Sequence, residues 1–262
     1  MSPEQWLERA AAVVADESFI VIAIAVAVGG FLRGFVGFGA ALVSVPVISL
    51  VFGPQLALPI VVIMGLPSVV QLLPDAVRHS EPPIVVPISI AIFLGVPLGT
   101  WVLVSVDPDL MKIVISSLVL LMVGSLALGW KLDQEVRARV LLLSGFAGGL
   151  VQGAAGIGGP PVVAVALSRA GSPERQRGNV LAVMTVIACC SMLSLYHFGL
   201  VTVQALVIGV ILFPIYSLFS WIGSRYFSSG GRLYFRRAAM VVLGVIGLVT
   251  LIVGVSDYLE KV

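Results

Sequence analysis

Eight long apolar runs, separated by short polar stretches, constrain the fold of this chain more than any other feature. The runs are Phe19–Val51, Leu56–Leu73, Ile84–Val106, Ile113–Trp130, Val140–Leu167, Val180–Phe198, Val201–Ile222 and Ala238–Val255. Apolar runs of about 18 residues or more are candidate membrane helices, because helices satisfy their own backbone hydrogen bonds in lipid. Only 11% of the residues are charged, against about 25% in soluble domains. We therefore predict an all-α polytopic membrane protein.

The polar stretches divide the chain into regions. Residues 1–18 are expected to form an N-terminal interfacial segment anchored by Trp6, and their acidic character argues against a signal peptide. The expected first repeat is 19–130, the charged cytoplasmic linker 131–139, and the second repeat 140–262. The net charge of +2 gives no indication of nucleic-acid binding. The adjacent Cys189 and Cys190 are interpreted as small packing residues, since neighbouring cysteines rarely fit disulfide geometry.

Two glycine-rich motifs indicate an internal duplication. The first reads GGFLRGFVGFGAALVSVP from Gly29, and the second reads GGLVQGAAGIGGPPVVAV from Gly148. A shift of 119 residues superimposes five glycines of the first motif on five of the second and places Arg33 on Gln152. A shift of 120 places Met64 on Met184 and Gln71 on Ser191. In transporters built from such repeats, the substrate site lies between the halves near the bilayer midplane.

The length of the first glycine-rich run favours a helical hairpin over a single crossing. Its 33 residues would extend about 50 Å as one helix, although a bilayer core is only about 30 Å thick. If all eight runs cross, arginine and lysine divide six against eight between the two sides. If both glycine-rich runs are re-entrant, they divide eleven against three, as the enrichment of cytoplasmic loops in these residues predicts. The bias is slightly stronger if only the second run is re-entrant, so whether the first run turns back or crosses stays open, and the duplication is the reason for treating the two alike. The two repeats would then be inverted, with broken helices at the midplane.

The glycines themselves have two interpretations. They permit positive φ and close approach of a ligand to the backbone, and helix N-termini at such breaks favour anions. Pro160 and Pro161 fit the first turn of a new helix. Two such helix starts facing one midplane would form an anion site. The alternative is that small residues only allow close helix packing.

The paired motifs and the duplicated architecture resemble the TauE/SafE family of sulfite exporters, which are membrane permeases. The resemblance covers nearly the whole chain and implies a secondary transporter, by expectation an exporter, of sulfite or small organosulfonates in a bacterial inner membrane. It implies no enzyme activity and no cofactor. The first motif departs from the family pattern because Ala40 follows Gly39, so the second repeat is expected to supply more backbone contacts. The expected substrate-binding residues are Arg33, Gly34, Gly37, Phe38, Gly39, Gln71, Gln152, Gly156, Ile157, Gly158, Gly159 and Pro160.

The polar residues within the apolar runs have different expected roles. Arg33 is the one arginine or lysine well inside a run, so it is either an anion ligand or a side chain that extends to an interface. Gln71 and Gln152 are expected near the substrate, and His197 at an interface. No Asp or Glu lies in the middle of a run, so a carboxylate proton relay has no candidate residues and the coupling ion stays open.

Two other functions remain as alternatives at this stage. An anion channel could use the same glycine-rich cradle. A membrane-embedded hydrolase would need a nucleophile with a base, or a metal set, and no HExxH motif or intramembrane carboxylate cluster is present. Beyond the small anion and the lipid bilayer, a homodimer is the one further partner left open.

Overall fold

The computed structural model describes residues 17–36, 39–127, 138–166, 173–226, 245, 248–249 and 251–259. Every regular element in these ranges is an α-helix, in agreement with the all-α prediction. The interfacial segment expected over 1–18 and the linker expected over 131–139 lie almost entirely outside the described residues. The helices are α2 (Glu17–Val36), α3 (Ala40–Phe52), α4 (Pro54–His79), α5 (Pro82–Ser105), α6 (Pro108–Ala127), α7 (Ala138–Ala155), α8 (Gly159–Ala166), α9 (Pro173–His197) and α10 (Val203–Tyr226).

The long apolar helices account for the membrane-protein composition. Four stretches of the described helices are long and apolar enough to cross a bilayer: Pro82–Ser105, Ala138–Ala155, Gly178–His197 and Val203–Gly223. Shorter apolar stretches occur in α2, α3 and the first half of α4. Large apolar side chains such as Phe93 and Trp101 are more than half exposed on the outer surface. Such a surface fits a polytopic membrane protein, in which lipid covers the apolar exterior.

Each glycine-rich run is divided into two helices that pack against each other. The first run is α2 followed by α3, and Gly39, with φ 103°, directly precedes α3. The second is α7 followed by α8, with Gly156 at φ 71° in the turn. Side chains rarely adopt these left-handed conformations, which explains why glycine occupies both positions. A Cβ on Gly29 of α2 would lie 2.8 Å from the Ser44 Oγ of α3, so the two arms of the first hairpin are in close contact.

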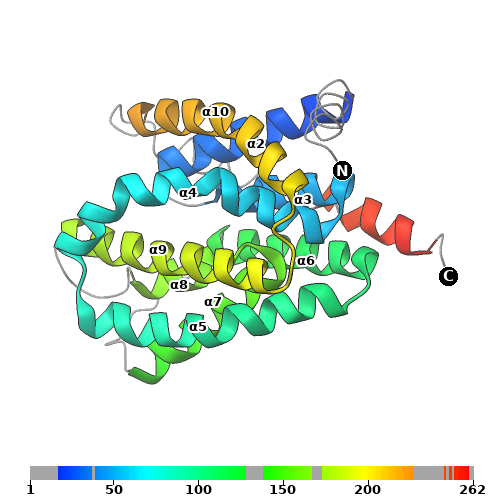
Figure 1. Cartoon of the computed structure of the whole chain (residues 1–262). Helices are drawn as coiled ribbons and strands as arrows, with labels where there is room; N and C mark the ends of the chain where they lie inside the picture. The colour runs from blue at the N-terminus through cyan, green and yellow to red at the C-terminus, as the bar shows by residue number, and fades with distance from the viewer. Residues whose placement is uncertain are drawn as a thin grey trace.

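The hairpins pack mainly on helices from the other half of the chain. Figure 1 shows α2 beside α10 at the top and α7 beside α5 at the bottom, with α4 and α9 between these pairs. The backbone of Tyr216 approaches Gly30 so closely that a Cβ there would be 2.7 Å from its carbonyl oxygen. Gly145 contacts Ile88 near the starts of α7 and α5, and Gly153 contacts Thr100 further along, so these two helices run parallel.

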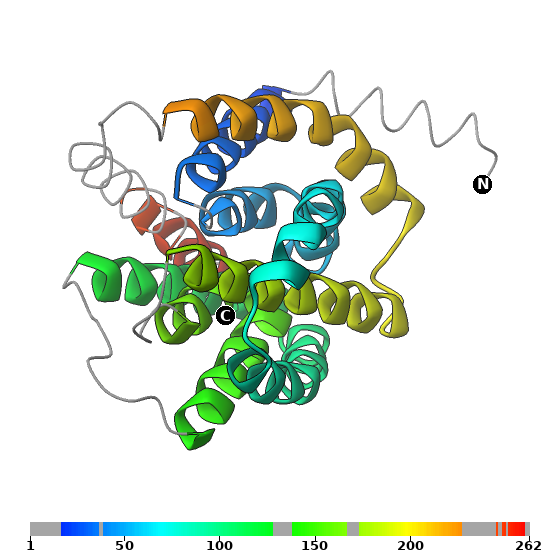
Figure 2. The ribbon, with the colours of Figure 1, turned by 90° about the vertical axis from the view of Figure 1, so that its left-hand side faces the viewer.

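Two of the three clusters of buried side chains follow the same division. One joins α2, α3, α10 and the first half of α4, and includes Ile22, Ile48, Ile60 and Leu212. A second joins α5, α7, α8 and α9, and includes Ile92, Leu141 and Val183. In the view of Figure 2, α4 and α9 again lie between the two groups. The third cluster joins α3 and α4 to α6 and α7, and includes Leu42, Leu58, Ile115 and Ala155, so it connects the two groups. Each group contains helices from both halves of the sequence.

The helices α4 and α9 run antiparallel, because the end of α4 meets the start of α9. Gly178 near the start of α9 touches His79 at the end of α4. Next to it, the Glu81 backbone N–H donates to the Asn179 Oδ1 at 2.6 Å, and the Asn179 Nδ2 donates to a Glu81 carboxylate oxygen at 3.0 Å. Arg175 lies 3.9 Å from the same carboxylate. This contact fixes the α4–α5 corner to the first turns of α9.

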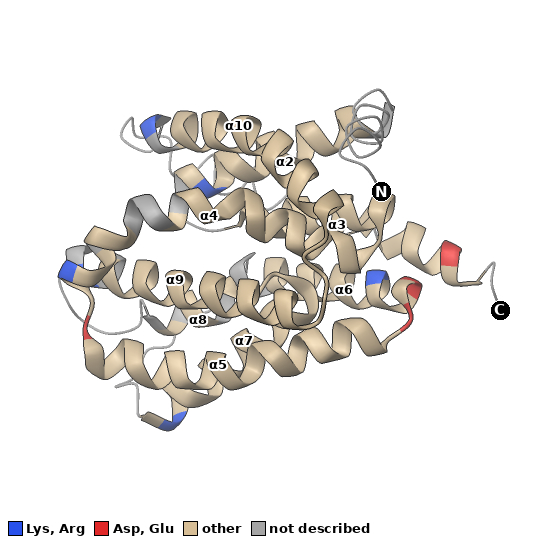
Figure 3. Ribbon diagram, viewed as in Figure 1, with Lys and Arg blue, Asp and Glu red and all other residues tan. Residues whose placement is uncertain are grey.

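Most of the basic side chains of the described part lie at the end of the molecule that contains this contact. Figure 3 shows blue residues gathered there, while the opposite end carries mainly acidic residues. Four arginines belong to helix ends at this side: Arg78, Arg139, Arg175 and Arg225. The topology in which all eight runs cross would put Arg78 and Arg175 on opposite sides. The Glu81 contact instead brings the start of α9, and Arg175 with it, beside the end of α4.

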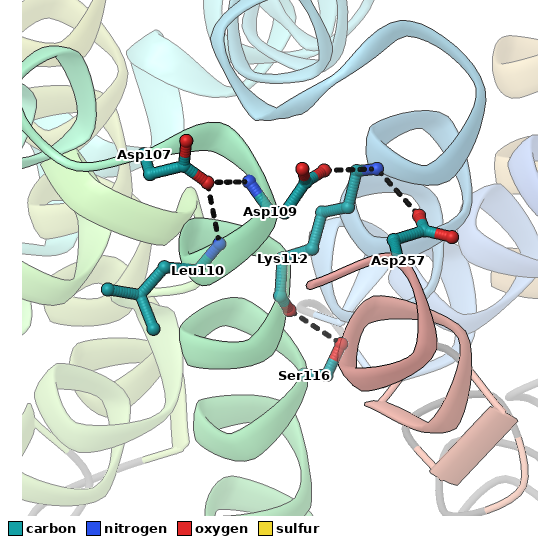
Figure 4. A network of polar contacts seen from close by, with 6 residues as sticks. All are labelled: Asp107, Asp109, Leu110, Lys112, Ser116 and Asp257. Carbon is teal, nitrogen blue, oxygen red and sulfur yellow. Dashed lines mark hydrogen bonds and ion pairs between the residues drawn. The ribbon is translucent and has the colours of Figure 1, made fainter. Parts of the chain in front are cut away.

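The opposite end is organised around Lys112 in the first turns of α6, as Figure 4 shows. Its ammonium lies 3.0 Å from the Asp109 carboxylate and 2.9 Å from that of Asp257 in the C-terminal residues 251–259. Asp107 precedes α6 and accepts the Asp109 N–H at 2.9 Å, as a helix N-cap does. Lys112 and Asp109 are 12% and 7% exposed, so their pairing compensates two largely buried charges. The lysine thereby connects α6 to the C-terminal segment.

Candidate functional site

A cavity of about 110 Å³ lies where the two hairpin turns meet α4, α9 and α10. One water molecule needs roughly 10–15 Å³ in the same measure, so a small polyatomic ion fits. Residues of the first turn (Gly39, Ala40 and Ala41) and of the second turn (Gly156, Ile157 and Gly159) face it together. The two motifs that are 119 residues apart in the sequence therefore line a common space.

Among the described residues that line the cavity, Arg33 is the single charged one. It belongs to the last turn of α2, one turn before the break, and its side chain is half-buried. Within the described part of the chain, no hydrogen bond or ion pair engages its guanidinium, and no Asp or Glu lines the cavity. The guanidinium therefore gives the cavity a positive charge.

Gln152 lines the cavity from the second hairpin and is 9% exposed. Its Oε1 accepts the Gly158 backbone N–H at 3.0 Å, directly before α8 begins. The side-chain amide therefore caps the turn, and its NH₂ group is the part left for other contacts. The turn is tight, since a Cβ on Gly158 would lie 2.6 Å from the Gln152 Cβ.

The other predicted site residues are distributed differently. Gly34 does not line the cavity, and Gly158 is buried behind it against Gln152 and Gly148. Gly37 and Phe38 lie outside the described residues. Gln71 and Pro160 belong to α4 and α8, but their side chains are not among those described. Six of the twelve predicted residues therefore line the cavity: Arg33, Gly39, Gln152, Gly156, Ile157 and Gly159.

The sequence analysis did not predict the part of the cavity wall that α4, α9 and α10 contribute. Its side chains are Leu58, Val61, Val62, Met64, Val69, Met184, Ile187 and Tyr216. The 120-residue shift that places Met64 on Met184 was the one sequence feature that pointed to these residues. Gly65 also faces the cavity, and a Cβ there would touch nothing within 4 Å.

The arrangement can hold an anion without burying a lysine. Arg33 is a pure donor, and Gln152 has only donors left once its oxygen is bonded to Gly158. The first N–H groups of α3 add further donors, because helix N-termini leave them unpaired. Two or three such donors around a mostly apolar wall suit a small oxyanion. Among the described residues, no cluster of His, Cys, Asp or Glu could hold a metal ion.

The comparisons with known proteins agree with this architecture. A family model described as "Sulfite exporter TauE/SafE" matches residues 21–250, which include both hairpins and every cavity-lining residue. The chain matches no curated protein and no solved structure. Because the match covers most of the sequence, the chain belongs to the TauE/SafE sulfite exporter family of multi-pass membrane transporters, which are not enzymes.

Proposed function

We propose that this transporter carries sulfite or small organosulfonates and binds them in the cavity between the two hairpin turns. The observation that carries the proposal is a cavity of about 110 Å³ with one uncompensated arginine and no carboxylate among its described lining residues. Family membership makes the protein a transporter of small anions and removes the hydrolase alternative. Export is the direction that the family description suggests.

The proposal includes a pair of inverted repeats, residues 19–130 and 140–262. In support of this, corresponding helices begin at nearly constant offsets: Ala40 and Gly159 differ by 119 residues, and Pro82 and Val203 by 121. In the two repeats, α2 corresponds to α7, α4 to α9 and α5 to α10. The contact of α2 with α10 thus corresponds to that of α7 with α5, and the contact of α4 with α10 corresponds to that of α9 with α5. All four pairs are in contact. The antiparallel α4 and α9 are the counterparts that such an inversion requires.

The charge distribution gives the proposed orientation. The end that contains Arg78, Arg139, Arg175 and Arg225 is the cytoplasmic one, because cytoplasmic segments are enriched in arginine and lysine. The α2–α3 hairpin then enters from the outside, and the α7–α8 hairpin enters from the cytoplasm. Their turns meet inside the membrane, where irregular backbone is tolerated only if it lines a cavity or is buried in protein.

Filling the cavity tests this function. A Cβ on Gly65 or on Gly124 of α6 would meet no atom within 4 Å, so both positions have room for a side chain. Gly65 lines the cavity and Gly124 does not, so leucine would enter the cavity only at position 65. We expect Gly65→Leu to lose sulfite binding by at least tenfold and Gly124→Leu to bind like wild type. The measurement is calorimetric titration of purified protein with sulfite, methanesulfonate and sulfate at fixed pH and salt.

Two results would contradict the proposal. If wild-type protein binds none of these anions, the substrate assignment is wrong. If Gly65→Leu binds as tightly as wild type, the cavity is not the site. The channel alternative is tested separately in liposomes, where saturable counterflow supports a transporter and large single-channel currents support a channel.

A further inference from the structure

The two hairpin turns differ in one hydrogen-bond acceptor, a side-chain oxygen that only the second turn has. In the second turn, the Gln152 side-chain oxygen accepts the Gly158 N–H at 3.0 Å. The equivalent residues in the first turn, 119 positions earlier, are Arg33 and Gly39. Arginine has five N–H donors and no acceptor, so it cannot serve the first turn as glutamine serves the second.

Among the described residues, the first turn has no such acceptor. Gly39 provides no side-chain cap to α3, and the hydrogen bond at this helix start runs from the Leu42 N–H to the Gly39 carbonyl at 3.1 Å. Within the described residues, the N–H groups of Gly39, Ala40 and Ala41 have no partner. Ala40 is buried, and Gly39 and Ala41 are partly buried. Because N–H groups in such surroundings are usually paired, these three donors are available to an acceptor in the cavity.

Space for that acceptor is present at Gly39 of the first turn and absent at its counterpart, Gly158 of the second turn. A Cβ on Gly39 would meet only the Leu32 Cβ, at 4.0 Å, whereas one on Gly158 would collide with Gly148 and Gln152. Arg33, Gly39, Ala40 and Ala41 all line the cavity. The unpaired donors, the positive charge and the open volume therefore lie at the same place.

We propose that the transported anion supplies to the first hairpin the acceptor that Gln152 supplies to the second. One oxygen accepts from the N–H groups at the start of α3, and another accepts from the Arg33 guanidinium. The ligand class is an oxyanion with at least two oxygens on one centre, such as sulfite or a sulfonate, because separate oxygens can then accept from the two donor groups. This inference rests on the proposed function, and it assigns the main backbone contacts to the first repeat rather than to the second.

Two substitutions at Arg33 distinguish the missing acceptor from the positive charge as the reason why the first turn binds an anion. Arg33→Met removes the charge and adds no acceptor, so the N–H groups stay unpaired and retain some affinity for an anion. Arg33→Gln also removes the charge, but it copies the second repeat and supplies an internal oxygen to the turn. We expect methanesulfonate binding to weaken about tenfold in Arg33→Met, which is about 1.4 kcal/mol, and at least threefold further in Arg33→Gln.

Thermal stability gives a second readout that does not depend on binding. Without anion, Arg33→Gln should melt at a higher temperature than Arg33→Met, because its turn is capped. With saturating methanesulfonate, wild type should gain more in melting temperature than either variant. Arg33→Lys keeps the charge and should retain part of the binding, so it serves as the conservative variant. Calorimetry and melting curves on the full chain, with methanesulfonate, sulfate and chloride as probes, provide all of these data.

The outcomes are distinguishable. Equal affinity in Arg33→Met and Arg33→Gln, with equal melting temperatures, would overturn the inference even if sulfite binds in the cavity. Tight chloride binding that depends on Arg33 would overturn the bridging geometry. If sulfate or phosphate binds and sulfur(IV) anions do not, while the order of the variants holds, the inference stands and the proposed substrate falls. If no anion binds to wild type, both are wrong.

Discussion

At the scale of single residues, Gln152 is the part of the site whose role differs most from expectation. It was predicted as a polar residue near the substrate, and it does line the cavity, but its oxygen is bonded to the Gly158 N–H. The glutamine is therefore a structural cap as well as a cavity-lining group. Sequence alone could place Gln152 opposite Arg33 in the repeat, but it could not reveal that one caps its turn and the other cannot.

These two roles of Gln152 can be separated by substitution. Gln152→Met leaves the buried Gly158 N–H unpaired and should destabilise the protein by about 1–3 kcal/mol. Gln152→Glu keeps an oxygen acceptor but brings a negative charge to the cavity, so it should stay closer to wild type in melting temperature and bind methanesulfonate much more weakly. Melting curves and calorimetry on both variants check this. A stable Gln152→Met protein would show that the hydrogen bond contributes little.

The site also predicts the pH dependence of binding at the residue scale. No His, Asp or Glu is among the described residues that line the cavity, and these are the side chains that ordinarily titrate near or below neutral pH. A sulfonate is ionised at every pH in the physiological range. The affinity for methanesulfonate should therefore be flat from about pH 6 to pH 8 at constant salt, as titration calorimetry can measure. A change of more than about threefold would mean that a titrating group near the cavity has been missed.

At the scale of helices, the glycines divide into two kinds that the sequence does not distinguish. Some form turns, such as Gly39 and Gly156, and these were predicted from the clustered motifs. Others lie inside helices and allow close crossing, as Gly95 and Gly99 of α5 do against α7. Both interpretations of glycine, as ligand cradle and as packing contact, therefore apply in this chain at different positions. Lone glycines in helices carry no signal of their partner, so the α5–α7 contact could not have been predicted.

A matched pair of alanine substitutions tests the packing role. A Cβ on Gly99 would collide with the backbone of Leu150 and Ala154, whereas a Cβ on Gly65 meets nothing within 4 Å. Gly99→Ala should force α5 and α7 apart and lower the melting temperature strongly or abolish folded yield. Gly65→Ala should fold like wild type, because alanine also suits a helix better than glycine. Similar stability of the two variants would contradict the close crossing.

At the scale of the whole molecule, the all-helical class was predictable, because composition and the length of the apolar runs decide it. The pairing of helices from opposite halves was not, since apolar helix faces in a membrane protein lack the amphipathic pattern that identifies partners. The arginine distribution was the most informative global signal. It brings Arg78 and Arg175 to one side only when the second glycine-rich run turns back, and the structure has these residues at one end.

Cysteine labelling can place these ends relative to the membrane. Ser80 and Ala138 lie at the basic end, and Ser105 lies at the opposite end, at the close of α5. In a background with Cys189 and Cys190 replaced, an impermeant maleimide added to intact cells should label Ser105→Cys and leave Ser80→Cys and Ala138→Cys unlabelled. Permeabilised cells provide the control that all three thiols are accessible. Labelling of Ala138→Cys and Ser105→Cys from the same face would exclude the proposed orientation.

The close contact between Gly30 and Tyr216 has a consequence for how the protein is made. The two residues are separated by most of the chain, so α2 enters the membrane long before its neighbour α10 has been synthesised. Contacts between such distant segments form late and slowly, and until then the packing surfaces of the early segments are exposed. The first half cannot reach its final packing on its own, because α10 supplies part of its core and α5 in turn completes the second half. The packing of α2 can therefore be completed only after α10 has been inserted, late in the synthesis of the chain.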